Sequence, residues 1–145
     1  MVKKKRYRSS SRSVSDLKAH LVLTTKYRGK CINAALLEQL ETSIRGLCEK
    51  WGVTVIEFNG EDDYVHLLFS YYPQMQLSKF INNLKTVNSG KVNKEFSEYL
   101  AQFFWKKDDD SKREFWNDSY AIESVGGANI EVLERYIRGQ NAPTR

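Results

Sequence analysis

VTVIEFNGEDDYVHLLFSYY, residues 53–72, is the stretch that decides the fold. It holds two runs rich in β-branched, aromatic and aliphatic residues, 53–59 and 64–72, joined by the short acidic segment GEDD. A connection of this length and composition favours a tight antiparallel hairpin. Residues i and i+2 of a strand point to the same face, so Tyr64 and His66 are expected to project side by side.

Upstream of this hairpin the sequence predicts one strand and one helix. The run AHLVLTT, Ala19 to Thr25, reads as a buried strand and is followed by the basic turn KYRGK, residues 26–30. Leucine and isoleucine then recur at three- and four-residue spacing, which predicts a helix with Asn33 as its N-cap and Gly52 as its stop.

Downstream of the hairpin we expect a helix, a strand and a last helix. The first begins near Leu77 and is expected to break or bend at residues 88–90, where Asn, Ser and Gly follow one another. The charged segment WKKDDDSKRE, residues 105–114, is predicted to be an exposed loop before a strand from about Tyr120 to Val125. The stretch NIEVLERYIRGQ, residues 129–140, is typical of a short helix.

The predicted order of elements is strand, helix, strand, strand, helix, strand, helix. This order predicts an α+β fold, a ferredoxin-like split βαβ sandwich with an antiparallel sheet and one extra C-terminal helix. Such folds bind RNA, DNA, metals and small molecules, so the fold selects no function.

Composition narrows the class of protein. A chain of 145 residues with 41% hydrophobic and 28% charged residues is typical of one soluble globular domain, and no apolar run approaches the roughly 20 residues needed to span a bilayer. The two cysteines lack metal-type spacing and follow no secretory signal, which indicates a cytoplasmic protein. A net charge of +5 suits a nucleic-acid partner without demonstrating one.

The chain is expected to divide into three segments. Residues 1–17 form a flexible basic arm, residues 18–140 the domain, and residues 141–145 a tail. The arm begins MVKKKRYRSSSR, which is either a solvated tail or a phosphate-contacting segment that binds by counterion release.

Four pieces of sequence, in this order, resemble a known family. They are TTKYRGK after the first strand, DDYVHLL in the hairpin, SVGG after the fourth strand and LERYIRGQ in the last helix. Together they are similar to the single-tyrosine transposases of small insertion sequences, in the HUH nuclease class, and to REP-associated tyrosine transposases. The similarity covers roughly Lys18 to Gln140.

The resemblance implies a set of site residues. The metal positions would be Tyr64, His66 and Gln140, holding Mg²⁺ or Mn²⁺, and the nucleophile would be Tyr136 on the C-terminal helix. The partners implied are single-stranded DNA with hairpins and a second copy of the chain in a homodimer, with no membrane. The DNA-contacting side chains expected are those of Lys26, Arg28, Lys30 and Lys85, with the basic turn as the strongest candidate.

Three positions depart from the family pattern, and one of them is Gly29 in the basic turn, where the family usually repeats a basic residue. The family has histidine where this chain has Tyr64, and a neutral phenol is a poor ligand for Mg²⁺ or Mn²⁺ beside an imidazole. Gly139 stands immediately before Gln140 and disfavours the helix there by about 1 kcal/mol. These departures open an alternative function, a catalytically impaired or repurposed protein that binds hairpin DNA without cutting it.

Each proposed site residue also has a purely structural interpretation. His66 would then be an ordinary strand histidine and Tyr136 a helix tyrosine packed on the sheet, and His20 in the first strand is expected to be structural. An RNA-binding module is a third reading of the whole chain, although the sheet lacks a recognisable pair of RNP aromatic motifs.

Overall fold

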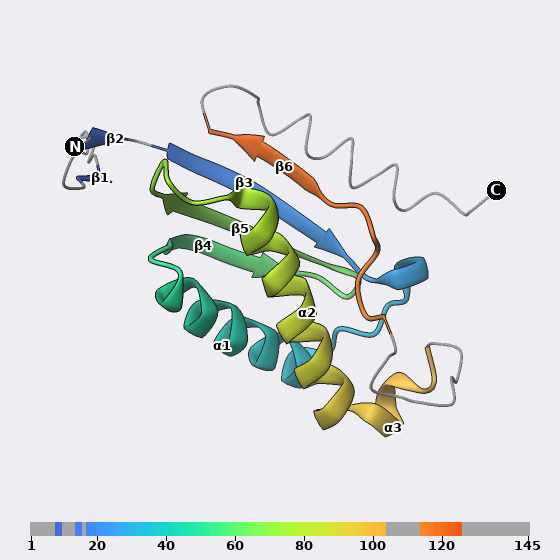
Figure 1. The fold of residues 1–145 in the computed structure, drawn as a ribbon. Coiled ribbons are helices and arrows are strands. Elements are labelled where there is room, and N and C mark those ends of the chain that lie inside the picture. Colours follow the sequence, from blue (N-terminus) through green and yellow to red (C-terminus); the bar gives the residue numbers. More distant parts are fainter. Residues whose placement is uncertain (1–7, 10–13, 16, 104–113, 126–145) are drawn as a thin grey trace, which may run out of the picture.

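A four-stranded antiparallel sheet is the framework of the molecule (Figure 1). The computed structural model describes residues 8–9, 14–15, 17–103 and 114–125. The sheet contains β3 (Leu17–Thr24), β4 (Thr54–Gly60), β5 (Tyr64–Tyr71) and β6 (Ala121–Ser124), in the order β4-β5-β3-β6. The first and third of these strands along the chain therefore lie in the centre, and this order confirms the ferredoxin-like split βαβ prediction.

The hairpin of β4 and β5 forms as the two β-rich runs and the short GEDD connection predict. Its ladder runs from Thr54 opposite Ser70 to Gly60 opposite Val65, with an irregularity between Val55 and Glu57. The whole length of β5 also pairs with β3, from Leu17 opposite Tyr71 to Thr24 opposite Tyr64. Strand β5 is therefore hydrogen-bonded on both sides.

The first helix, α1 (Ala34–Lys50), begins and ends where its sequence signals lie. The side-chain oxygen of Asn33 accepts a hydrogen bond from the Leu36 amide at 2.8 Å, which confirms the predicted N-cap. Gly52 follows the helix with φ of 70°, a left-handed conformation that glycine adopts without steric cost.

The second helix, α2 (Leu77–Glu95), differs from the prediction because it runs unbroken through residues 88–90. Asn88 and Val92 are buried on one side of this segment, while Gly90 is exposed. Burial of the apolar face outweighs the roughly 1 kcal/mol that glycine costs in a helix. The short helix α3 (Ser97–Leu100) begins only after Glu95.

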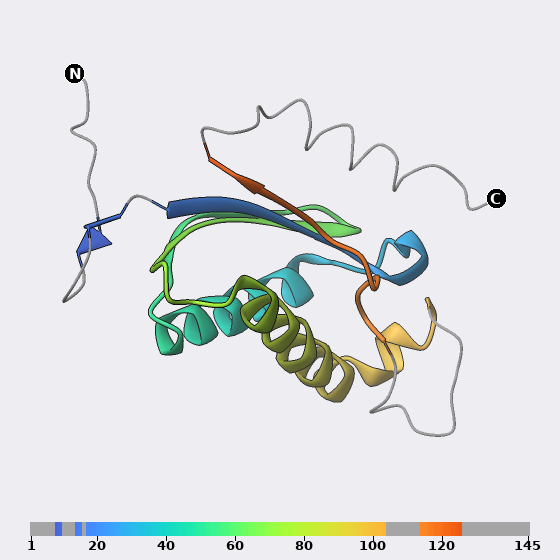
Figure 2. The same cartoon turned by 45° about the horizontal axis from the view of Figure 1, so that its top comes forward.

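The core lies between the sheet and the two long helices. Figure 2 shows α1 and α2 on the same side of the sheet. The largest fully buried side chains of the sheet and of these two helices come from alternate positions of the strands and from one face of each helix: Leu21, Leu23, Leu67 and Phe69 from the sheet, Leu36, Leu40 and Ile44 from α1, and Phe80, Ile81 and Leu84 from α2.

Three predicted segments fall wholly or partly outside the described residues. The last helix, residues 129–140, and most of the charged loop, residues 105–114, are among them. In the basic arm, β1 (Arg8–Ser9) pairs with β2 (Val14–Ser15). Among the described residues, none of the helices combines the length and hydrophobicity that a membrane crossing requires.

Candidate active site

The face of the sheet opposite α1 and α2 carries the candidate site. Strand alternation places Tyr64 and His66 of β5 on this face, because their neighbours Val65 and Leu67 point into the core. The ladder between β3 and β5 sets His66 opposite Val22 and Thr24 opposite Tyr64. The two residues therefore share one face, as their spacing predicts.

His66 meets a second histidine on this face. Nε2 of His66 lies 2.7 Å from Nδ1 of His20 on β3, and the two rings are nearly parallel, with centroids 4.9 Å apart and an interplanar angle of 12°. Burial lowers the pKa of His66, and His20 lowers it further, while Glu57 raises it. A lowered pKa favours the neutral imidazole, which is the form that binds a metal.

Tyr64 has different surroundings from His66. Its ring packs against Val22 and Ala121, two buried apolar residues of β3 and β6 on the face opposite α1 and α2. Burial raises the pKa of the Tyr64 phenol, and the carboxylates of Glu61 and Asp63 raise it further. The hydroxyl is thus held in its protonated form, which is a weak metal ligand.

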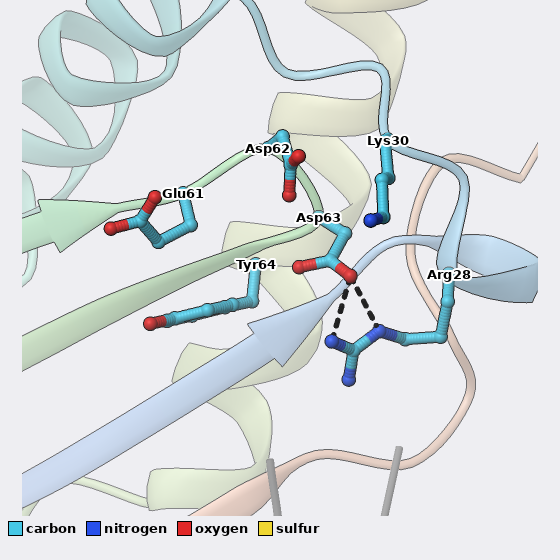
Figure 3. A pocket seen from close by; sticks show the side chains of 6 residues that line it. All are labelled: Arg28, Lys30, Glu61, Asp62, Asp63 and Tyr64. Atoms are coloured by element: carbon cyan, nitrogen blue, oxygen red, sulfur yellow. Dashed lines mark hydrogen bonds and ion pairs between the residues drawn. The ribbon is translucent and has the colours of Figure 1, made fainter. Parts of the chain in front are cut away.

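A polar cavity of about 400 Å³ lies at the end of the sheet next to Tyr64 (Figure 3). Arg28 and Lys30 line it from the segment after β3. Glu61, Asp62 and Asp63 of the β4–β5 turn line it from the other side, together with Tyr64 at the start of β5. Two nitrogens of the Arg28 guanidinium donate to the same carboxylate oxygen of Asp63, Oδ2: Nε at 3.0 Å and Nη2 at 2.7 Å. This ion pair joins the basic turn to the hairpin.

The basic turn itself has a strained backbone. It forms the 3₁₀ turn η1 (Lys26–Arg28), in which Tyr27 and Arg28 have φ of 58° and 56°. Non-glycine residues rarely adopt this left-handed conformation, and surrounding contacts must hold them there. Besides the Arg28 ion pair, the Thr25 amide donates to the Asp63 carbonyl oxygen at 2.9 Å.

The four side chains expected to contact DNA lie in distinct environments. Arg28 is in the ion pair just described, and Lys30 is exposed beside the cavity. Nζ of Lys26 lies 2.7 Å from a Glu114 carboxylate oxygen, and this contact raises the pKa of Lys26. Nζ of Lys85 donates to the Asp118 carbonyl oxygen at 3.0 Å, and burial lowers the pKa of Lys85. Their role in DNA binding stays a prediction.

Two of the expected site residues, Tyr136 and Gln140, lie outside the described residues. Within the described part of the chain, no group of three or more histidine, cysteine, aspartate or glutamate side chains is arranged to hold a metal ion. The contact between His20 and His66 joins only two such side chains.

The contact between His20 and His66 was not predicted from the sequence, where His20 was expected to be structural. A signal was present, since His20 is a single polar ring within an apolar strand. The split βαβ topology places the first and third strands side by side, so two strand histidines on one face can meet. Neither strand predicts this contact on its own.

Comparisons with known proteins identify the family of this chain. The profile of the family described as "Transposase IS200 like" matches residues 13–140. The transposase for insertion sequence element IS200 of Salmonella typhimurium is 28% identical over 125 residues, which cover 86% of this chain and 77% of that protein. The ISDra2 transposase TnpA of Deinococcus radiodurans is 27% identical over 128 residues, covering 88% and 86%.

Two solved structures share the fold. A crystal structure of a candidate transposase from Deinococcus radiodurans superposes with a TM-score of 0.79 at 23% identity, covering 92% of this chain and 97% of that one. A REP-associated tyrosine transposase bound to a REP hairpin superposes with a TM-score of 0.51 at 8% identity, covering 94% and 68%. Because the family profile spans nearly the whole chain, this protein belongs to the IS200-like transposases.

Proposed function

We propose that this transposase cleaves and rejoins single-stranded DNA at hairpin-bearing ends, through a covalent link between Tyr136 and a 5′ phosphate. The observation that carries the proposal is the family match over residues 13–140, which includes both Tyr136 and Gln140. The position of His66 on the open face of the sheet supports it.

The proposed chemistry is a balanced exchange of phosphodiester bonds. The Tyr136 oxygen forms a bond to phosphorus while the bond to the 3′ oxygen breaks, and the leaving strand takes up a proton as a 3′ hydroxyl. A later attack by a 3′ hydroxyl on the phosphotyrosine reverses these changes and joins two strands. The phosphotyrosine keeps the bond energy, so rejoining needs no further energy source.

A divalent cation fits the residues of this site in part. When bound, Mg²⁺ or Mn²⁺ would polarise a phosphoryl oxygen of the scissile phosphate. His66 is the proposed imidazole ligand, since its lowered pKa favours the neutral form that binds a metal, and Gln140 is the proposed amide ligand. Tyr64 does not fit the role of a ligand, since it packs on Val22 and Ala121 with a raised pKa.

DNA binding is proposed to involve the basic turn and a homodimer. Exposed Lys30 and the neighbouring Lys26 would contact phosphates, a contact that makes affinity fall with salt. Light scattering at several protein concentrations tests the dimer.

The test of the function uses hairpin DNA from the chromosomal locus that encodes the protein. The purified protein and its Tyr136→Phe variant are incubated with this DNA and Mn²⁺, and a denaturing gel separates protein linked to DNA from free protein. We expect an adduct with the unaltered protein, none with Tyr136→Phe, and equal DNA affinity for both. An adduct that persists in Tyr136→Phe would refute the assignment of the nucleophile.

A second candidate function is hairpin binding without cleavage. The packing of Tyr64 against Val22 and Ala121 favours it, because the position occupied by histidine in the family contributes no imidazole here. This function predicts tight hairpin binding that is the same in Mn²⁺ and in EDTA. It also predicts that Tyr64→His restores an adduct that the unaltered protein does not form.

A further inference from the structure

The two histidines of the chain meet at one point of the molecule. They are 46 positions apart in the sequence, and the pairing of β3 with β5 brings their rings together on the open face. The contact joins Nδ1 of His20 to Nε2 of His66, so one ring nitrogen from each strand points at the other. Two convergent imidazole nitrogens are a common arrangement at sites that bind transition metals.

We propose that His20 is a metal ligand beside His66. It supplies the second imidazole, which Tyr64 does not provide. The purpose of this metal site rests on the proposed function, because the bound cation would be the one that serves DNA cleavage. Its chemistry rests on the contact between the two rings, which is independent of any DNA substrate.

The geometry requires only a small opening of the pair. The two nitrogens are 2.7 Å apart, as in a hydrogen bond with one shared proton. Two metal–nitrogen bonds of about 2.1 Å that meet at about 90–110° hold their nitrogens about 3.0–3.4 Å apart. The nitrogens would therefore move apart by less than about 1 Å, the shared proton would leave to solvent, and both rings would turn so that their lone pairs point at the cation rather than at each other.

The surroundings favour the two histidines over Tyr64 as ligands. Tyr64 is the direct partner of Thr24 on β3 and packs toward Val22 and Ala121, whereas His66 contacts His20. Glu123 on β6 is the direct partner of His20 and so shares its face, where its carboxylate would add negative charge beside a bound cation.

The donor set also predicts the class of cation. Imidazole nitrogens suit ions such as Co²⁺, Ni²⁺ and Zn²⁺, whereas Mg²⁺ prefers oxygen ligands and keeps much of its water. Two protein ligands leave positions open for water and for a DNA phosphate. We therefore expect Co²⁺ to bind more tightly than Mg²⁺.

The test is calorimetric titration of Co²⁺ into protein that has been stripped with chelator and carries no polyhistidine tag. The variants are His20→Ala, His66→Ala and Tyr64→Phe, with Asn59→Ala as the control because Asn59 is the partner of His66 on β4. Circular dichroism and thermal unfolding in EDTA verify that each variant is folded.

We expect His20→Ala and His66→Ala each to weaken Co²⁺ binding by at least about tenfold, since even an outer partner of a metal ligand typically contributes that much. Tyr64→Phe and Asn59→Ala should bind as the unaltered protein does. Undiminished binding in His20→Ala, or a loss in Tyr64→Phe equal to that in His66→Ala, would overturn the proposal.

A spectroscopic measurement on the unaltered protein covers the case in which His20→Ala does not fold. Electron paramagnetic resonance of bound Cu²⁺ distinguishes two imidazole nitrogens, as expected here, from one, which would overturn the proposal. The outcome is separable from that of the adduct test. If His20→Ala loses Co²⁺ binding and the unaltered protein forms no DNA adduct, the metal pair is supported and cleavage is refuted. If the unaltered protein forms the adduct and His20→Ala binds Co²⁺ undiminished, cleavage is supported and the metal pair is refuted.

Discussion

The ion pair between Arg28 and Asp63 is expected to be a main support of the strained basic turn. Their side chains are 12% and 7% exposed, and both Arg28 donors bond to one carboxylate oxygen. Arg28→Ala removes these bonds and leaves the Asp63 carboxylate buried without its cation. It also removes a side-chain contact that holds Arg28 at a positive φ.

The magnitude follows from the burial of the pair. Removal of one partner from a buried ion pair typically destabilises a protein by about 3–5 kcal/mol. Because this pair lines a polar cavity that water can enter, we expect a cost near the lower limit, about 3 kcal/mol. For a domain of this size each kcal/mol lowers Tm by about 2–4 °C, so Tm should fall by about 6–12 °C.

Urea and thermal unfolding of matched variants measure this cost. Arg28→Lys keeps the charge but not the fork of two donors, so it should recover only part of the loss. The control is Arg45→Ala, since Arg45 forms an exposed ion pair with Glu41 within α1, where exposed pairs contribute about 0.5 kcal/mol or less. A cost for Arg28→Ala no larger than that for Arg45→Ala would refute the structural role of the Arg28 pair.

Three further predictions concern local structure. Asn33→Ala removes the cap that accepts from the Leu36 amide and should lower the free energy of unfolding by about 1 kcal/mol, as measured in urea, with Asn33→Ser close to neutral. Gly52→Ala places a side chain at φ of 70° and should cost about 1–2 kcal/mol in the same assay, and a neutral effect would contradict the left-handed assignment. Burial raises the pKa of Cys31 to about 12 and that of Cys48 to about 11, so both stay protonated at pH 8. Alkylation should therefore be slow in native protein and fast in urea, and fast native labelling would contradict the burial of these thiols.

The fold could be predicted because each strand and helix carries its own local signal. Residues 53–72 contain two β-rich runs joined by a short acidic connection, and α1 has both a cap at Asn33 and a stop at Gly52. The predicted break at residues 88–90 was wrong because it rested on helix propensity alone. Buried Val92 shows that tertiary packing continues through this segment, and such packing is not visible in a local window.

The sequence predicts the arrangement of site residues only where they lie on the same strand or helix. The shared face of Tyr64 and His66 follows from a spacing of two on a strand. The contacts of His66 with His20 and of Arg28 with Asp63 join residues 46 and 35 positions apart, and they depend on how whole strands align. Long-range pairs of this kind require the sheet register, which local sequence does not supply.

The most direct test of the central claim is mass spectrometry of the protein after it has reacted with hairpin DNA and Mn²⁺. Nuclease trimming and proteolysis would leave a short nucleotide remnant on any residue that had attacked the DNA. The proposed function predicts one modified peptide, with the remnant joined by its 5′ phosphate to the oxygen of Tyr136. A remnant on any other residue, or unmodified Tyr136 after all of the DNA has been cleaved, would contradict it.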